Sequence, residues 1–417
     1  MLLGKQRTYH DPLHGAITLD SSDRQEALLI KLIDSPEFQR LRRIRQLDVA
    51  SFTFHGAEGS RFTHSLGVMY LVRRAFDRLA TKYPLLLPHR AVVLVAGLLH
   101  DLGHSAFSHA GEEIFHSNHE QWTAKLVQSG RVAEILSDYD PSLPQQVVQA
   151  LQKTYPIPLV TQLVSSQLDC DRLDYLQRDG YFTGAKYGQL DLDRILMAMD
   201  YDQVSQKLVV TRKGLVAIEH YLMVRYFMYL QVYNHPKNLA ARFVLQQIFR
   251  RVQDLLAAGE QVPMDQVVRN WFSLLNGELS CGDYLAADDV LFTYHIQTWQ
   301  RSPDQILADL TRRFLDRDLF KTRDISQLNE SEVAIAQTQL HQDLLAKDLP
   351  PTYYLGKVKA LTKGYTLYPL HKDGNTRHNG QEIEIKTDQN LVKITDLSPL
   401  VATISQPINR AWLVFPS

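Results

Sequence analysis

Apolar residues recur at spacings of three and four along most of the chain, which is the pattern of helices that bury one face. The pattern starts near Gln25, and a second helix is predicted to begin at Ser35 and Pro36, which are favoured residues at a helix N-terminus. After a loop over residues 48–60, further helices are predicted over residues 62–84, 89–102, 118–137, 144–153, 157–168 and 169–182.

Some segments are instead rich in β-branched residues or alternate between apolar and polar positions, which is typical of strands. Residues 6–20 predict a small hairpin, and residues 207–211 predict a strand before two long helices near 214–234 and 237–257. Helical stretches continue to about residue 320. Beyond a helix at 331–347, strands are predicted at residues 352–359, 363–369, 381–386, 391–395 and 408–415, with an exposed turn at 372–380.

The order of these elements predicts a mainly α fold with two parts. Residues 1–325 form a helical body, whose central bundle covers about residues 45–235, and residues 326–417 form a C-terminal α+β lobe. A chain of 417 residues is long enough to bury a large apolar core.

Composition indicates which kinds of binding partner and which cellular compartment to expect. The chain has 45 lysines and arginines against 46 aspartates and glutamates, so we expect no nucleic-acid partner held by a broadly basic surface. Its two cysteines, Cys170 and Cys281, are too few for a disulfide framework and favour a reducing, cytoplasmic setting. We expect no membrane association, since the sequence begins without a signal-peptide core and contains no apolar run of membrane-spanning length.

The densest set of chemically active residues follows the apolar run that ends at Leu99. His100, Asp101, His104 and His109 lie within ten residues, and imidazoles and carboxylates serve as metal ligands and proton carriers. A polar helix end with solvent-facing histidines would give the same local pattern. A functional site is favoured over this alternative, because an Arg-Phe-Thr-His stretch lies upstream and an Asp-rich helical stretch lies downstream.

Together, His64, His100, Asp101 and Asp171 resemble the ordered metal-ligand signature of the HD-domain metal-dependent phosphohydrolases. The three segments that carry them are separated by 36 and 70 residues, so only a folded bundle brings them together. Two imidazoles and two carboxylates suit a borderline divalent ion, iron, zinc or manganese, and leave positions for water and a phosphate oxygen. The alternative interpretation is a buried ion-pair cluster without a metal.

The resemblance extends beyond the metal ligands. Further stretches match, in order, the dNTP triphosphohydrolase branch of that family, which includes bacterial dGTPases and the vertebrate sterile-alpha-motif HD protein. These stretches are Asp11–Gly15, Asp34–Arg42, Gln46–Leu47, Arg61–Gly67, His100–His109, His119–Gln121 and Asp171–Tyr175. The match covers roughly residues 5–325. It implies an HD-domain helical bundle that hydrolyses dNTPs, with Mg²⁺ accompanying the nucleotide, to deoxynucleoside and tripolyphosphate.

The resemblance also implies how substrate is bound. Tyr175 and Asp179 follow Asp171 at four-residue spacings, so one helical face presents a ligand, an aromatic ring and a second carboxylate. In the family that tyrosine and that second carboxylate hold the deoxyribose, the carboxylate taking the 3′-hydroxyl, and Tyr233 matches the ring that crowds the 2′ position. The other residues expected to bind substrate are Gln46, Leu47 and the phosphate-contacting Arg61, Arg172 and Arg225.

Departure of a 5′-alkoxide requires a general acid with a pKa near neutrality. The resemblance favours His109 as this acid, supported by His104, Glu112 and His119. The sequence alone does not separate His104 from His109. The nucleophile is expected to be a metal-activated water that attacks the α-phosphorus.

The family match further implies a regulatory site, where GTP or dGTP would bind between the subunits of a homo-oligomer, a dimer or tetramer. Its residues match Arg7, Asp34, Gln39, Arg42, Arg317 and Lys321. An aspartate can recognise guanine by accepting hydrogen bonds from its N1/N2 edge, while an arginine stacks on the ring. Asp34 with Ser35 would, however, also form an ordinary helix N-cap. An adjoining dNTP activator site matches less well, since family asparagine and lysine positions are occupied here by His10, Ala217 and Pro236.

Three other interpretations stay open. The chain could be another HD-domain phosphohydrolase, acting on nucleoside monophosphates, a cyclic nucleotide or guanosine tetraphosphate. It could also be a nucleotide sensor with little turnover, or a nucleic-acid-binding protein or nuclease. The matched Arg61, Tyr175 and Asp179 argue against the first, the intact ligand set against the second, and the neutral net charge against the third.

Overall fold

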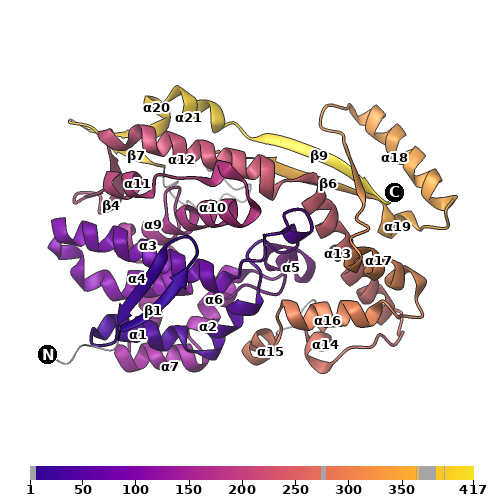
Figure 1. Ribbon diagram of the computed structural model, residues 1–417, viewed down its shortest axis with the longest axis horizontal. Coiled ribbons are helices and arrows are strands. Elements are labelled where there is room, and N and C mark those ends of the chain that lie inside the picture. Colours follow the sequence, from indigo (N-terminus) through magenta and orange to yellow (C-terminus); the bar gives the residue numbers. More distant parts are fainter. Residues whose placement is uncertain (1–5, 274–278, 363, 366–381, 389) are drawn as a thin grey trace.

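In the described part of the chain, helices packed around a large apolar core make up most of the structure, together with three small sheets (Figure 1). The computed structural model describes residues 6–273, 279–362, 364–365, 382–388 and 390–417. The described chain begins with a hairpin of strands β1 (Gln6–Asp11) and β2 (Gly15–Asp20), which pair antiparallel as the sequence predicts.

The mainly helical segment between residues 24 and 183 carries most of the candidate site residues, in its helices and in the turns between them. Asp23 and Ser35 accept hydrogen bonds from backbone amides at the starts of the first two helices, as expected for helix N-caps. The helices are α1 (Arg24–Ile33), α2 (Pro36–Arg40), α3 (Arg61–Lys82), α4 (Arg90–Leu99), α5 (Ser108–Phe115), α6 (His119–Val127), α7 (Gly130–Tyr139), α8 (Leu143–Leu151), α9 (Pro158–Val164) and α10 (Cys170–Thr183).

Helix α4 lies at the centre of this part. Every residue from Ala91 to Leu99 is buried, because this apolar run is surrounded by other helices. Helix α3 packs against α4 and also against α10, which is more than one hundred residues away in the sequence. The three segments that carry the predicted metal ligands therefore belong to one packed unit.

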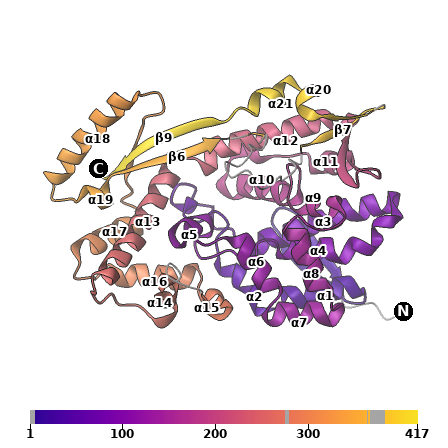
Figure 2. The same cartoon turned by 180° about the vertical axis from the view of Figure 1, so that it is seen from behind.

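The second half of the chain lies along the top and the right of this unit in Figure 1, and along its top and left in Figure 2. Its helices are α11 (Leu192–Ala198), α12 (Leu215–Met228), the π-helical turn η6 (Tyr229–Tyr233), α13 (Pro236–Ala257), α14 (Gln266–Ser273), α15 (Cys281–Ala286), α16 (Asp289–Trp299), α17 (Gln305–Leu315), α18 (Glu330–Leu345), α19 (Pro351–Tyr354), α20 (Ile394–Leu397) and α21 (Pro399–Ile404). Short 3₁₀ turns are η1 (Leu41–Arg43), η2 (Ala50–Phe52), η3 (Pro84–His89), η4 (Lys186–Gly188) and η5 (Arg212–Gly214). Among the described helices, none combines the length and apolar character that crossing a bilayer requires.

Strands from the end of the chain complete two sheets that begin earlier in the sequence. The first has the order β3 (Met199–Asp202), β4 (Lys207–Thr211), β7 (Glu384–Lys386) and β8 (Leu391–Lys393). The second has the order β5 (Lys321–Asp324), β9 (Ile408–Phe415) and β6 (Gly356–Thr362), with β9 antiparallel to both neighbours. The division into a body before residue 325 and a lobe after it stays a prediction.

The mainly α prediction is confirmed, and so are most elements, including the hairpin, α3, α13, α18 and β9. The single helix predicted at 118–137 is wrong, because the chain turns at Gly130, which has φ +61°, between α6 and α7. The strand predicted at 352–359 starts only at Gly356, because Pro351 opens the short helix α19. Strands β3 and β5 and helices α20 and α21 had no predicted counterpart. The turn at 372–380 and most of the strand at 363–369 lie outside the described residues.

We predict that Gly103→Ala destabilises the fold, because the loop after α4 lies directly on α6. A Cβ at residue 103 would lie 2.2 Å from the backbone nitrogen of Thr123 and 2.4 Å from the carbonyl oxygen of His119. Relief requires backbone movement, so we expect a loss of about 1 to 3 kcal/mol or more in the free energy of unfolding. Urea unfolding measures it, with Gly282→Ala as the control, since a Cβ there meets only ordinary contact distances. Equal stability of both variants would contradict this packing.

Candidate functional site

The four predicted metal ligands come from three elements. His64 lies in the first turn of α3, and His100 and Asp101 follow directly after α4, which ends at Leu99 rather than at 102 as predicted. Asp171 lies in the first turn of α10, whose N-cap Asp169 accepts a hydrogen bond from the backbone nitrogen of Arg172. Helix termini thus bring all four side chains toward one point.

The distances between these side chains fit a metal centre. His64 Nε2 lies 3.3 Å from His100 Nε2, 3.1 Å from Asp171 Oδ1 and 3.6 Å from Asp101 Oδ2. His100 Nε2 lies 3.3 Å from Asp101 Oδ1 and 3.6 Å from Asp171 Oδ1. Ligand atoms about 2.1 Å from one ion and at right angles to each other are roughly 3 Å apart. The donor set therefore fits a divalent metal ion, and its nitrogen and carboxylate donors match that chemistry.

The charges at this point balance each other. Burial alone would raise the pKa of Asp101, but Arg61, His100 and His104 outweigh burial and hold it well below its usual range. Burial would likewise lower the pKa of His64, but Asp171 and Asp174 raise it to about 10. The carboxylates therefore attract positive charge, which a proton or a metal ion can supply. Metal binding is expected to release protons.

Arg61 lies inside the site, one helical turn before His64. Its side chain is only 3% exposed and forms an ion pair with Asp101. Its Nε donates to Ser108 Oγ at 2.8 Å, which joins the start of α3 to the start of α5. The structure therefore places the predicted phosphate-contacting arginine against a metal-ligand candidate.

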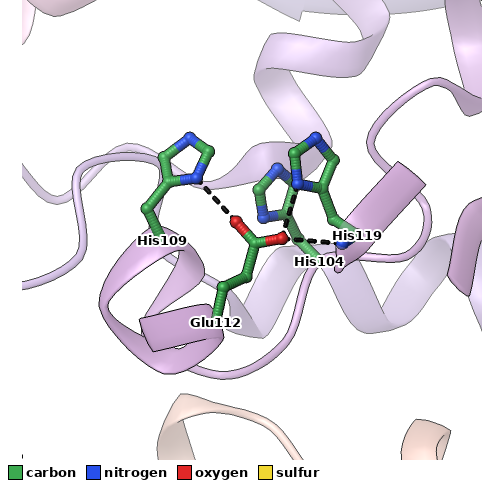
Figure 3. Close-up of side chains that lie close together, drawn as sticks. All are labelled: His104, His109, Glu112 and His119. Atoms are coloured by element: carbon green, nitrogen blue, oxygen red, sulfur yellow. Dashed lines mark hydrogen bonds and ion pairs between the residues drawn. The ribbon is translucent and has the colours of Figure 1, made fainter. Parts of the chain in front are cut away.

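Three histidines and a glutamate form a second cluster beside the first (Figure 3). Glu112 accepts hydrogen bonds from Nδ1 of His109 and Nδ1 of His119, both at 2.7 Å, and from the backbone nitrogen of His119 at 2.6 Å. The ring of His104 stacks on that of His119, with centroids 4.0 Å apart. Since the carboxylate only accepts, it fixes the proton of each bonded histidine on Nδ1.

His104 and His109 have different surroundings. His104 is buried next to the ligand Asp101, at 3.4 Å, and burial, Arg61 and His119 hold its pKa well below the usual range. Its Nδ1 has no hydrogen-bond partner among the described residues. The side chain of His109 is 58% exposed. A neutral buried ring thus adjoins the metal ligands, and an exposed ring oriented by Glu112 lies beside it.

A buried carboxyl and two tyrosines lie farther along α10. Tyr233 donates to Asp179 Oδ2 at 2.8 Å, and its ring packs edge-on against Tyr175, with centroids 6.0 Å apart. Burial raises the pKa of Asp179 to about 7, although the hydrogen bond from Tyr233 lowers it. Tyr233 ends the π-helical turn η6, a rare conformation that is frequent at functional sites.

The remaining substrate candidates surround the turn before α10 or the loop before α3. Arg172 Nε donates to the carbonyl oxygen of Ser166 at 2.7 Å, and Arg225 Nη1 donates to Gln167 Oε1 at 3.0 Å. Both arginines hold the 166–169 turn, rather than lying on a free surface. Gln46 and Leu47 are half-buried, and the carbonyl oxygen of Gln46 accepts from Arg61 at 3.5 Å.

The predicted regulatory residues fall into two groups. Arg7 pairs with Asp34, and Gln39 accepts from Arg42 Nε at 2.8 Å, so these four lie around the junction of α1 and α2. Ser35 alone caps α2, which leaves the Asp34 side chain about half exposed and paired with Arg7. Arg317 and Lys321 follow α17 in the chain, and α17 lies on the opposite side from α1 in both views (Figures 1 and 2). Among the described residues no hydrogen bond or ion pair joins the two groups.

Three residues that the structure brings to the metal centre have no predicted role. Asp174, His14 and Arg178 lie buried behind His64, and Asp174 accepts a hydrogen bond from its Nδ1 at 2.7 Å. His14 and Asp174 belong to the Asp11–Gly15 and Asp171–Tyr175 matches, whereas Arg178 lies in none of the matched stretches. However, contacts across 110 residues are not visible in a sequence.

A helical bundle that joins two histidines and two aspartates in this order defines the HD-domain class, and the HD domain family indeed matches residues 61–179. The Bacillus subtilis protein YwfO is 39% identical over 355 residues, which are 85% of this chain and 79% of that protein. Human deoxynucleoside triphosphate triphosphohydrolase SAMHD1 is 32% identical over 216 residues, which are 43% of this chain and 33% of that protein. A crystal structure of a Bacteroides thetaiotaomicron phosphohydrolase has a TM-score of 0.84 at 26% identity, with 99% of this chain and 100% of that chain covered.

These similarities confirm the resemblance seen in the sequence motifs. The chain belongs to the HD-domain phosphohydrolase family, in the part that is similar to the deoxynucleoside triphosphate triphosphohydrolases. It is a hydrolase with a divalent metal site of histidines and aspartates.

We predict that Asp179→Asn changes how the stability of the metal-free protein depends on pH. The native carboxyl keeps its proton up to about pH 7, whereas an unfolded aspartate releases it near its usual value of 3.8. Stability contributed by this proton is therefore complete below pH 3.8 and is lost as the pH rises through 7. Between pH 5 and pH 8 the variant should gain about 2 to 3 kcal/mol relative to the wild type.

Urea unfolding at both pH values measures this difference. Asp193→Asn is the control, because its side chain is 77% exposed and pairs with Arg74 at the surface. A relative stability of Asp179→Asn that stays the same at both pH values would contradict a protonated native Asp179.

Proposed function

We propose that this hydrolase is a metal-dependent dNTP triphosphohydrolase that releases deoxynucleoside and tripolyphosphate. The observation that carries the proposal is the contact between two clusters. The metal-ligand candidates meet the histidine–glutamate cluster where His104 Nε2 lies 3.4 Å from Asp101 Oδ1. Phosphate activation and proton donation would thus occur within one site, next to the buried pair of Asp179 and Tyr233.

His64, His100, Asp101 and Asp171 would hold the metal, and iron, zinc or manganese suits these donors. A divalent ion there supplies Lewis-acid polarisation of the phosphate and of the attacking water. The water oxygen would bond to the α-phosphorus and release a proton to solvent, and the bond from phosphorus to the 5′ oxygen would break. His109, as the imidazolium whose Nδ1 proton is held by Glu112, would donate its Nε2 proton to that oxygen. His109 is the better donor than His104, since it is exposed and oriented by Glu112.

Cations and sugar contacts complete the proposed substrate site. Arg61, Arg172 and Arg225 would face the triphosphate, which also carries Mg²⁺. Asp179 and Tyr175 would hold the deoxyribose, and Tyr233 would leave no room for a 2′-hydroxyl. Gln46 would add a 3′-hydroxyl contact beside Leu47, and its Oε1 is buried without a hydrogen-bond partner among the described residues.

A guanine nucleotide, GTP or dGTP, is proposed as an activator. The Asp34 side chain is available for base recognition because it caps no helix N-terminus, and Arg7 is its ion-pair partner among the described residues. The group of Arg7, Asp34, Gln39 and Arg42 lies away from Arg317 and Lys321 in one chain. A site that uses all six residues would therefore form between subunits, which supports a homo-oligomer, either a dimer or a tetramer.

A cytoplasmic setting is also proposed. Its support is that Cys170 and Cys281 are both free thiols.

We predict that replacing both His100 and Asp101 with alanine removes bound metal and abolishes hydrolysis, while the helical circular dichroism persists. Metal content is measured by elemental analysis, and products from each dNTP and NTP are separated by chromatography. The matched control replaces His295 and Asp265, a histidine–aspartate pair 3.2 Å apart that lies outside the candidate site. Full activity of the His100/Asp101 variant would contradict the proposed site. Orthophosphate as the product of the wild type would indicate another HD-domain phosphohydrolase.

We predict that Asp34→Ala loses activation by GTP but keeps its metal, because Asp34 lies outside the ligand set. The wild type should show a lag or a sigmoidal dependence on dGTP that added GTP removes, with a nucleotide-dependent rise in mass by light scattering. The control is Glu134→Ala, which removes another exposed ion pair, that with Arg131. If the wild type and Asp34→Ala both show hyperbolic kinetics that GTP does not change, the proposed activator site is wrong and Asp34 only forms an ion pair with Arg7.

A further inference from the structure

Behind His64, on the side away from the other ligands, lies a buried network of charged residues. Asp174 Oδ2 accepts from His64 Nδ1 at 2.7 Å, and Asp174 Oδ1 contacts His14 Nε2 at 2.6 Å. Arg178 donates to the same carboxylate through Nε at 2.7 Å and Nη2 at 2.9 Å. The side chains of these four residues are at most 3% exposed. A carboxylate this deeply buried is retained only where its charge is used or fully compensated.

We propose that Asp174 is a positioning residue of the metal centre: it orients His64, and His14 from the N-terminal hairpin holds Asp174 in place. The proposal rests on the metal centre of the proposed function. It gives a role to His14 and Asp174, two motif positions that neither the ligand set nor the substrate site uses.

The chemistry of a carboxylate explains how the orientation is imposed. A carboxylate that is held by an arginine only accepts hydrogen bonds, so the facing Nδ1 of His64 carries a proton. Metal binding, which displaces a proton from the other nitrogen, then leaves the lone pair of His64 on Nε2. That Nε2 is the atom that faces His100 and Asp171. Because Arg178 and His14 hold the carboxylate from its other sides, it can fix His64 in this one tautomer.

The packing around Asp174 leaves no room for a side chain at residue 67. Gly67 lies one helical turn after His64 on α3, and a Cβ there would lie 2.0 Å from Asp174 Oδ1 and 2.5 Å from Arg178 Nη2. The glycine that ends the Arg61–Gly67 motif is thus required for Asp174 to reach His64. On α10, Asp171 and Asp174 are one turn apart, so the ligand and its positioning residue share one helix face.

The N-terminal hairpin is tied into this network at two points. Asp11 Oδ1 accepts from the backbone nitrogens of Leu13 and His14, both at 2.9 Å, which shapes the turn that presents His14. Asp11 Oδ2 accepts from Arg178 Nη1 at 2.9 Å. A hairpin that is mostly exposed along β1 therefore ends in buried contacts with the metal centre.

The test measures metal affinity directly, without substrate. The metal-free protein is titrated with Mn²⁺ or Zn²⁺ against a competing chelator, and its unfolding is followed in urea with and without metal. We expect Asp174→Asn to bind metal about 10- to 100-fold more weakly, as for other partners of metal-bound histidines. The matched control is Asp304→Asn, since Asp304 also accepts two hydrogen bonds from one arginine, Arg251, but contacts no metal-ligand candidate.

A second pair of variants tests the hairpin and stays informative should Asp174→Asn not fold. His14→Ala should weaken metal binding about 2- to 10-fold, the value of one hydrogen bond, and His14→Gln should restore most of it by keeping a donor. Wild-type metal affinity in Asp174→Asn and His14→Ala, with only the metal-free stability lowered, would overturn the proposal and leave a structural network. Failure of the wild type to bind metal would overturn the metal centre and this proposal together, whereas metal binding without dNTP hydrolysis would overturn the proposed substrate alone.

Discussion

Burial of ionised carboxylates beside histidines is the constraint on which the site depends. Asp101 and Asp174 are both buried, and removing the partner of a buried charge costs about 3 to 5 kcal/mol. Each therefore has an arginine against it, Arg61 for Asp101 and Arg178 for Asp174. Helix α3 connects the two pairs, because its Arg61 reaches Asp101 after α4 and its His64 meets Asp174, which Arg178 holds within α10. Fold and site are thus held by the same ion pairs.

The site is asymmetric as a consequence. On the side of Asp174 it is closed, and each donor has an acceptor. On the opposite side the Asp171 side chain is 31% exposed and that of His109 is 58% exposed. Because the ligand candidates are held on the side of Asp174, the free coordination positions of a bound metal ion would face solvent, from which a phosphate can enter. This asymmetry is what a hydrolytic centre requires, because water and substrate must reach the ion while its ligands stay fixed.

The sequence was informative where local pattern and residue chemistry act alone. Helix periodicity located α3, α10 and α13, and the ordered histidines and aspartates predicted metal-ligand candidates, for which the structure has distances of 3.1 to 3.6 Å between donor atoms. Prediction from the sequence failed where contacts between distant segments determine the structure. The break between α6 and α7 depends on Gly130 lying beside Glu37, and β5 forms because β9 pairs with it. Asp174 was overlooked for the same reason, since its partners come from the hairpin and from α3.

The hairpin links the two proposed sites mechanically. Arg7, which pairs with Asp34 at the proposed regulatory site, and Asp11, which holds Arg178, both belong to the six-residue strand β1. The strand is paired with β2 along its whole length, so it moves as one unit. A nucleotide that displaces Arg7 would therefore act on the residues behind His64. If binding at Asp34 changes metal affinity, metal must change nucleotide affinity by the same factor, because the coupling between two binding sites is reciprocal.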